Sequence, residues 1–489
     1  MNKPTYRQRL TKSGIAIIAL LVIMIGWREY SKSMTTNDHA KQRSDNYSNQ
    51  LQVPPLLDYT KVDGIKLFNL NAQKSTYQFS ADAISETYGY NGPILGPTIR
   101  ATRGDKLDIA VTNNLDEQTT SHWHGAVVPG DADGGIHNII NPNETWHAKF
   151  TVSQPAATLW YHPHQHQETA KQVYNGLGGF LIIDDQDSSS LGLPTNYGVD
   201  DIPLVIQSKK LDQSGKLEPY QVSHMEQAQG LEGNTIMLNA QVKPYLNIST
   251  NLIRLRLLNG SNSDTYNVSL SSGQEFYVIG TDGGLLEQPV SVTTLELTTA
   301  KRYEILIDSS AITGDNPALM INNSAELLFT KKEQLTDKYT LPNSLIKFDE
   351  LPNAEIDRDF DLGMLMGNQD SMMSGRMNFG INDQSFDSNR INFTVNADSL
   401  EYWRIYNDPS GMSTNHPFHI HATQFQIISI NQEKPPDLLR GWHNTIDLKP
   451  GDEVVLAVPF AENLSGTYMY HCHILEHEDA GMMGQFQIQ

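Results

Sequence analysis

Four His-x-His pairs are the feature of this 489-residue sequence that most limits how it can fold. Side chains alternate between the two faces of a β-strand, so a pair on a strand presents two imidazoles on one side. Neutral imidazole is a preferred ligand for zinc, copper, iron and nickel, so the pairs predict a shared metal cluster without identifying the metal. A single His-x-His pair usually consists of ordinary surface or core histidines, whereas four such pairs in one chain indicate a metal site. The pairs are His122/His124, His162/His164, His419/His421 and His471/His473.

An internal repeat divides these pairs between the two ends of the chain. Thr158–His164 and Thr467–His473 share the pattern T-x-x-Y-H-x-H, which indicates related surroundings. Polar, turn-rich stretches at 184–197 and 331–358 separate the chain into three parts. We therefore expect β-domains at 53–187, 198–335 and 355–489. The middle domain lacks a His-x-His pair and is interpreted as a spacer or a substrate-side support.

Short strand-like runs separated by Gly, Pro, Asn and Asp predict an all-β fold with few long helices. Five of these runs are Thr98–Arg103, Lys106–Thr112, Ile253–Leu258, Phe276–Ile279 and Phe425–Ile430.

Charge and cysteine content exclude some classes of protein. Lys and Arg number 35 against 56 for Asp and Glu, so the formal charge of −21 argues against nucleic acid as a partner. Cys472 is the only cysteine, so no intramolecular disulfide can form.

The N-terminal residues are typical of an export signal. Lys3, Arg7, Arg9 and Lys12 precede the apolar run Ile15–Trp27, which is shorter than the roughly 20 residues of a membrane-spanning helix. Residues 1–34 are interpreted as a signal peptide or a retained inner-membrane anchor, and residues 35–52 as a polar tether. We expect a periplasmic protein.

Cys472 narrows the choice of metal. It lies between His471 and His473, so alternation turns its sulfur away from the face that those two imidazoles occupy. A cysteine, two histidines and a methionine form the ligand set of a blue-copper site. Structural zinc, the alternative, does not account for eight further histidines. The residues available for the blue-copper site are His416, Cys472, His477 and Met482.

The sequence resembles the three-domain multicopper oxidases in four motifs, and within them most closely the bacterial cuprous oxidases and laccase-like enzymes. The resemblance implies three cupredoxin-like Greek-key β-sandwiches, four copper ions and a monomer. It assigns type 1 copper to the blue-copper set above, type 2 copper to His122 and His419, and no other cofactor. The motifs are His122-Trp-His-Gly125, His162-Pro-His164, His416-Pro-Phe-His-Ile-His421 and His471-Cys-His-Ile-Leu-Glu-His477.

The same resemblance assigns the other six histidines of the His-x-His pairs to the type 3 copper pair. His124, His162 and His473 would bind one ion, and His164, His421 and His471 the other. His166 shares their face but exceeds the ligand count, so we interpret it as a supporting residue. His137, His147, His224 and His443 have no ligand spacing and are interpreted as ordinary histidines.

The implied reaction is the four-electron reduction of O2 to water, fed by single electrons from a donor at type 1 copper. Asp133 and Glu478 match acidic positions that supply protons in similar enzymes. The alternative readings are that Asp133 is a turn residue and that Glu478 is a solvated side chain.

The electron donor is predicted from methionines. Met364, Met366, Met372, Met373 and Met377 lie close together, and Met412 precedes His416 by four residues. Thioethers suit Cu(I), so Met364 and Met412 are candidate substrate ligands, with Asp361, Asp370 and Asp408 adding negative charge. These methionines could equally pad a core. In similar enzymes this region is longer and contains histidine, which leaves a role in copper homeostasis open.

Other functions remain as alternatives to Cu(I) oxidation. Fe(II) or a phenol could be the donor, as in ferroxidases and laccases. A copper-free scaffold, like the cell-division proteins of this superfamily, and a copper-storage protein are the alternatives without turnover. The complete ligand set argues against the scaffold.

Overall fold

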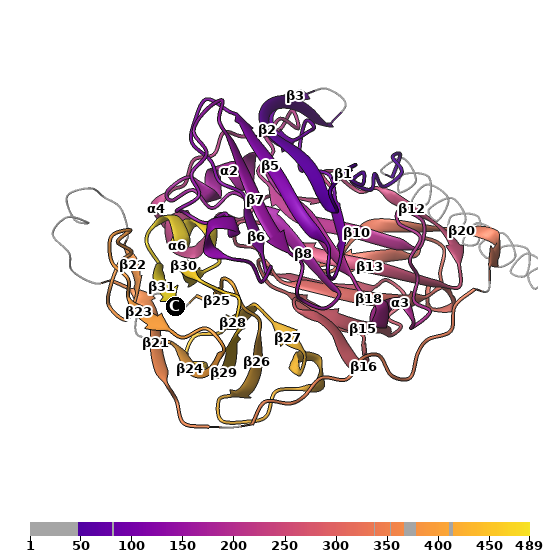
Figure 1. The fold of residues 1–489 in the computed structure, drawn as a ribbon. Coiled ribbons are helices and arrows are strands. Elements are labelled where there is room, and N and C mark those ends of the chain that lie inside the picture. The colour runs from indigo at the N-terminus through magenta and orange to yellow at the C-terminus, as the bar shows by residue number, and fades with distance from the viewer. Residues whose placement is uncertain (1–46, 81–82, 337, 353, 366–377, 410–413) are drawn as a thin grey trace, which may run out of the picture. The chain divides into compact units, whose positions relative to one another are not determined.

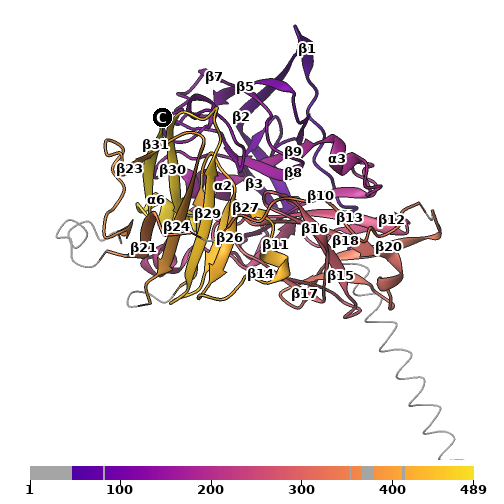
Figure 2. The same cartoon turned by 60° about the horizontal axis from the view of Figure 1, so that its bottom comes forward.

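The computed structural model describes residues 47–80, 83–336, 338–352, 354–365, 378–409 and 414–489. From Leu51 onward the described strands form six sheets, two in each of three sandwiches (Figures 1 and 2). This confirms the all-β prediction. The terminal segment 1–34, Asp370 and the methionines at 366, 372, 373, 377 and 412 lie outside the described residues.

Alternating burial explains why the predicted runs form strands. Along Lys106–Asn114, buried Leu107, Ile109, Val111 and Asn113 alternate with more exposed residues. Strand Leu252–Asn259 is buried on both faces, because Ile253, Leu255 and Leu257 enter a core while the arginines between them form buried ion pairs. All five predicted runs are strands, with ends that differ by at most two residues.

The first sandwich contains strands β1 to β9. Its sheets have the orders β1-β2-β5-β7, with β3 also paired to β2, and β4-β9-β8-β6. The strands are β1 (Thr60–Val62), β2 (Ile65–Ser80), β3 (Ala83–Tyr90), β4 (Ile99–Thr102), β5 (Lys106–Asn114), β6 (His122–His124), β7 (Thr145–Thr151), β8 (Ala157–His162) and β9 (Gly179–Asp184).

The middle sandwich contains strands β10 to β20. Its sheets have the orders β11-β10-β13-β18-β15-β16 and β12-β20-β19-β14-β17. The strands are β10 (Asp201–Lys209), β11 (Thr235–Leu238), β12 (Tyr245–Thr250), β13 (Leu252–Asn259), β14 (Tyr266–Leu270), β15 (Phe276–Thr281), β16 (Gly284–Val292), β17 (Thr294–Leu297), β18 (Arg302–Asp308), β19 (Ala318–Ile321) and β20 (Ser324–Thr336).

The third sandwich contains strands β21 to β31. Its sheets have the orders β22-β21-β24-β29-β26-β27 and β23-β31-β30-β25-β28. The strands are β21 (Arg358–Met364), β22 (Phe379–Ile381), β23 (Phe393–Val395), β24 (Ser399–Asn407), β25 (His416–Ile420), β26 (Phe425–Ile430), β27 (Trp442–His443), β28 (Thr445–Leu448), β29 (Glu453–Phe460), β30 (Gly466–Cys472) and β31 (Met483–Ile488).

Helices in the described residues are short and lie in the connections. The α-helices are α2 (Thr169–Asn175), α3 (Gln186–Ser189), α4 (His224–Gln229) and α6 (Leu475–Asp479), and the 3₁₀ turns are η1 (Gly130–Ala132), η2 (Ser309–Ala311) and η3 (Asp437–Leu439). None of the helices described here combines the length and apolar character needed to cross a bilayer.

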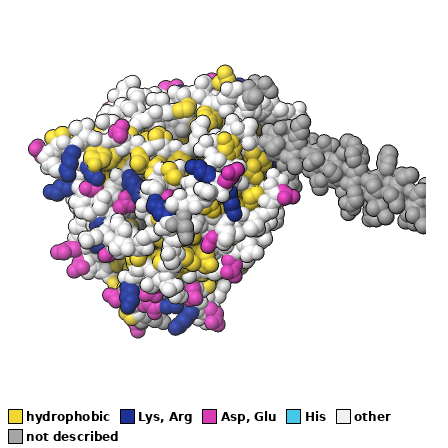
Figure 3. Space-filling view, turned by 90° about the vertical axis from the view of Figure 1, so that its right-hand side faces the viewer, with side chains coloured by type: hydrophobic (Ala, Val, Ile, Leu, Met, Phe, Trp, Pro, Cys, Tyr) yellow, Lys and Arg dark blue, Asp and Glu magenta, His cyan; other side chains and the backbone are white. Residues whose placement is uncertain are grey.

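Each sandwich has its own main hydrophobic core. Trp123 and Tyr161 lie in the first core, Tyr266 and Phe276 in the second, and Trp403 in the third. Acidic and basic side chains are interspersed on the face drawn in Figure 3, so the excess of acidic residues does not form one continuous acidic surface there.

Two expected connecting segments are more ordered than the sequence suggests. At the end of the expected tether, Leu51 packs into the core of the middle sandwich and its N–H donates to Tyr245 O. The polar stretch expected between the second and third domains begins inside β20, which continues to Thr336 through parallel pairing with β12. Polar composition alone did not reveal this pairing, because the part of β20 after Thr330 is largely exposed and tolerates the charged residues Lys331, Lys332 and Glu333.

Candidate metal centre

Strand pairing brings the His-x-His pairs together. In the first sandwich β6 runs antiparallel to β8, so that His122 is opposite His162. In the third sandwich β25 runs antiparallel to β30, so that His419 is opposite His471. All eight imidazoles are buried. The tandem spacing and the two strand pairs therefore collect eight ligand side chains from segments about 300 residues apart.

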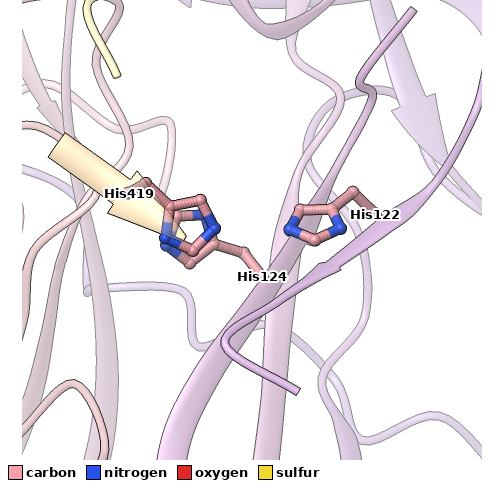
Figure 4. A group of neighbouring side chains, drawn as sticks. All are labelled: His122, His124 and His419. Atoms are coloured by element: carbon pink, nitrogen blue, oxygen red, sulfur yellow. The ribbon is translucent and has the colours of Figure 1, made fainter. Parts of the chain in front are cut away.

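The eight histidines form three groups, two of which share His124, and in each group the candidate ligand atoms lie within 4.8 Å of one another. Each group contains side chains from both the first and the third sandwich. In Figure 4 the rings of His124 and His419 overlap beside His122, and their centroids are 3.7 Å apart. The groups are His122, His124 and His419; His124, His162 and His473; and His164, His421 and His471. They place together the residues that the sequence predicts for type 2 and type 3 copper.

Hydrogen bonds to the outer nitrogen orient most of these rings. A ring that donates its Nδ1–H to a carbonyl oxygen keeps a lone pair on Nε2, the nitrogen that faces the cluster. The Nδ1–H groups that donate in this way are those of His122 to Asp133 O, His162 to Pro163 O, His419 to Asn444 O and His471 to Cys472 O.

Inside the cluster, nitrogen lone pairs face one another. Burial, and then the neighbouring imidazoles, lower the pKa of His164 and His471 well below the usual value, so both rings are neutral. His164 Nε2 lies 3.1 Å and His421 Nε2 lies 3.3 Å from His471 Nε2. His122 Nε2 and His419 Nε2 are buried without a hydrogen-bond partner. These inward-facing nitrogen lone pairs have no hydrogen-bond donor to face, so the site fits metal cations, which would accept the lone pairs.

A second group lies around Cys472, on the other face of β30. The Sγ atom is 3.5 Å from His416 Nδ1 and 3.7 Å from His477 Nδ1. Met482 is buried in the same core, and its carbonyl accepts the Cys472 N–H at 3.0 Å. Burial raises the pKa of the thiol, and a bound metal ion would reverse this because a coordinating thiol is deprotonated. The donor set fits copper at a blue-copper site.

His477 is enclosed on two sides. Its Nε2–H donates to Ala228 O of α4, in the middle sandwich, at 3.0 Å. The Phe379 ring stacks on the imidazole with centroids 4.0 Å apart. Met364 is half-buried and pairs with Phe379 across β21 and β22, so this candidate substrate ligand lies one strand pair from the Cys472 group.

The two predicted acidic residues contact cluster histidines. Asp133 Oδ2 accepts a hydrogen bond from His421 Nδ1 at 2.8 Å. Glu478 Oε1 lies 3.5 Å from His164 Nδ1, and its Oε2 lies 3.3 Å from His471 Nδ1. Burial, reinforced by Asp479, raises the pKa of Glu478 well above its usual value. Both carboxyl groups are buried, so the solvated-surface reading of Glu478 is wrong.

The histidines without ligand spacing lie outside the groups. His137 contacts Gln485, and the exposed ring of His147 contacts Asp108. His166, which does have ligand spacing, also lies outside the groups and packs against Phe386 beside a cavity of about 440 Å³. His443 is different, because it is fully buried and bonds to Lys301 of the middle sandwich at 2.8 Å. Sequence spacing gave no indication of this contact.

Comparison with known proteins decides the family. Three family models, each described as multicopper oxidase, match residues 71–188, 224–341 and 358–489. The chain belongs to the multicopper oxidase family. It is therefore a copper-containing oxidoreductase with dioxygen as acceptor, built from three cupredoxin-like sandwiches.

Curated relatives include both oxidases and a protein of another class. The multicopper oxidase mco of Staphylococcus haemolyticus (strain JCSC1435) is 40% identical over 475 residues, covering 95% of this chain and 100% of the relative. The cell division protein FtsP of Xenorhabdus nematophila is 33% identical over 460 residues, covering 92% of this chain and 94% of the relative.

Two solved multicopper oxidases illustrate the range of similar structures. The laccase from Pediococcus acidilactici Pa5930 has a TM-score of 0.82 at 34% identity, covering 90% of this chain and 94% of that one. The enzyme from Campylobacter jejuni, described as a metallo-oxidase, has a TM-score of 0.76 at 30% identity, covering 91% and 96%.

Replacement of Cys472 by serine separates the two groups. We expect Cys472→Ser to abolish the blue absorption of the copper-loaded oxidase while the eight cluster histidines still bind copper, because the cysteine lies on the opposite strand face. Absorption spectra and copper analysis of the loaded protein measure this. Loss of all copper from the variant would contradict two separate groups.

Proposed function

We propose that the protein oxidises Cu(I), with Fe(II) or a phenol as the alternative donor, and reduces O2 to two waters with four electrons and four protons. Type 1 copper would be held by His416, Cys472, His477 and Met482, and type 2 copper by His122 and His419. The type 3 pair would be held by His124, His162 and His473 and by His164, His421 and His471. When bound, these coppers would take electrons one at a time and deliver four of them to one O2.

The observation that carries this proposal is that one short segment joins both groups. His471 and His473 lie in the histidine cluster, while Cys472 between them lies against His416 and His477. Covalent bonds therefore connect a single-electron site to a multi-electron site. A storage protein would not need this connection, and a scaffold would need neither group.

The donor proposal rests on the surroundings of the Cys472 group. Ala228 and Phe379 cover His477, which is fully buried, whereas His416 keeps a slight exposure and follows Met412 by four residues in the sequence. Met364 offers a soft ligand next to Phe379, and Asp361 on the same strand has a raised pKa because of burial and then Asp408. The relative described as a metallo-oxidase supports a metal donor, and the relative described as a laccase supports the phenol alternative.

The cellular setting is proposed from the N-terminal sequence. A basic segment followed by the apolar run Ile15–Trp27 supports export to the periplasm, with or without retention in the inner membrane. Copper homeostasis is the role that oxidation of Cu(I) there would serve.

A donor comparison tests the substrate. Met364→Leu combined with Met412→Leu should lower the rate of Cu(I)-dependent oxygen uptake about tenfold and leave phenol oxidation unchanged, because leucine keeps the volume but removes the thioether. Met320→Leu, on β19 of the middle sandwich, is the matched control. Equal losses with both donors would show that these methionines only pack.

Proton delivery gives a second test. Asp133→Asn and Glu478→Gln should each slow oxygen uptake at saturating donor about 100-fold, the scale of lost proton transfer, with copper content unchanged. Asp131→Asn, on η1 two residues before Asp133, is the control. Variants that keep the full rate across pH would exclude these carboxyl groups as proton carriers.

A further inference from the structure

The middle sandwich provides none of the cluster histidines, yet it inserts charged side chains beside them. Asp282 follows β15, and Lys301 and Arg302 stand at the start of β18. All three are buried, Asp282 and Arg302 fully so. A buried arginine is stable only when its five N–H donors find acceptors, so its partners indicate what it holds in place.

Arg302 contacts all three sandwiches. Its Nε–H donates to Thr158 O in β8 of the first sandwich at 3.1 Å. One Nη1–H donates to Asn444 Oδ1 of the third sandwich at 2.9 Å, and another to Ala300 O at the same distance. Its Nη2–H donates to Asp282 O at 3.2 Å. The planar fork thereby fixes three chain segments relative to one another.

Asn444 touches two cluster histidines at once. Its backbone oxygen accepts the Nδ1–H of His419 at 2.6 Å. Its Oδ1 atom lies 3.2 Å from His124 Nε2, and its Nδ2 atom has no partner. Both rings belong to one candidate metal group. Asn444 is therefore the link between Arg302 and the cluster.

We propose that Arg302 is a positioning residue for the histidine cluster, acting through the side-chain amide of Asn444. Guanidinium has only donors, so Oδ1 and not Nδ2 of Asn444 must face Arg302. The same oxygen then accepts from His124 Nε2, which fixes the proton on that nitrogen. Nδ1 of His124, 3.4 Å from His162 Nε2, is left as its ligand atom. His124 would thus bind through Nδ1, whereas His122, His162, His419 and His471 keep Nε2 for the cluster.

The glycine of His122-Trp-His-Gly125 supports this arrangement independently. Gly125 has φ +87°, and a Cβ atom there would lie 2.4 Å from Asn444 Nδ2 and 2.8 Å from Arg302 Nη2. The residue after His124 therefore lacks a side chain where Asn444 and Arg302 approach.

Lys301 holds the residues on both sides of Asn444. Its Nζ donates to His443 Nδ1 and to Thr445 O, each at 2.8 Å, and to Asp282 Oδ2 at 2.9 Å. The Thr445 N–H donates to the same carboxylate oxygen at 3.3 Å. Because Lys301 and Asp282 hold His443 and Thr445, the Asn444 side chain is the part of this segment that Arg302 orients.

The test compares substitutions that are close in size, and it rests on the proposed binding of four coppers. Asn444→Leu keeps the backbone oxygen but removes the Oδ1 acceptor that Arg302 and His124 share, which leaves Thr445 Oγ1, 3.3 Å from His124 Nε2, as the remaining side-chain partner of that ring. Asn444→Asp keeps an acceptor for both. Arg302→Lys removes the fork. Arg358→Lys, on β21 of the third sandwich, removes a guanidinium fork that pairs with Glu401 and is the matched control.

Each protein is loaded with copper and dialysed against EDTA, and the remaining copper, the blue absorption and the EPR signal of non-blue Cu(II) are measured. We expect Asn444→Leu and Arg302→Lys to lose at least one of four coppers, about tenfold faster than the parent, with the blue absorption unchanged. Asn444→Asp and Arg358→Lys should keep all four. Thermal unfolding of the copper-free proteins shows whether each variant folds. If Arg302→Lys does not fold, the comparison of Asn444→Leu with Asn444→Asp tests the inference by itself.

Two results would overturn the inference. Equal loss from Asn444→Leu and Asn444→Asp would mean that Asn444 only fills space, and full retention by Arg302→Lys would mean that the fork is not needed. A parent protein that holds no copper would instead overturn the proposed function together with this inference, so the two failures are distinguishable.

Discussion

The arrangement of neutral imidazoles with lone pairs directed at one another governs the rest of this structure. Eight histidines are removed from water at a site where several inner nitrogens have no proton donor to face. Without cations this arrangement would lose hydrogen bonds to water and gain none in return. Metal binding and the closing of the first sandwich on the third are therefore expected to stabilise each other.

Buried charges of the middle sandwich meet the first sandwich in a second region. Arg256 bonds Asp201 at 2.6 Å and Glu304 at 2.8 Å, and Glu304 also accepts from the Thr158 hydroxyl of β8. Thr158 lies four residues before His162 on β8. The middle sandwich is thus more than a spacer, because it fixes the strand that ends at His162 and leads directly to His164.

The sequence was sufficient to predict the site where its geometry depends on neighbouring residues of one strand. Period-two alternation predicted that His471 and His473 share a face and that Cys472 points away, and the structure places them in this way. It was insufficient for Arg302 and Asn444, which are 142 residues apart and have no mutual spacing signal. The reversed ring of His124 depends on that contact, so it also could not be predicted. The contact of His443 with Lys301 could not be predicted for the same reason, since the two residues lie in different sandwiches.

The most direct test of the account is the number and position of copper ions in the loaded protein. Anomalous diffraction at the copper edge should give four peaks, one beside Cys472 and three among the eight histidines of the His-x-His pairs. A protein with copper beside Cys472 alone, or with none, would contradict the account, because the histidine cluster would then serve another purpose.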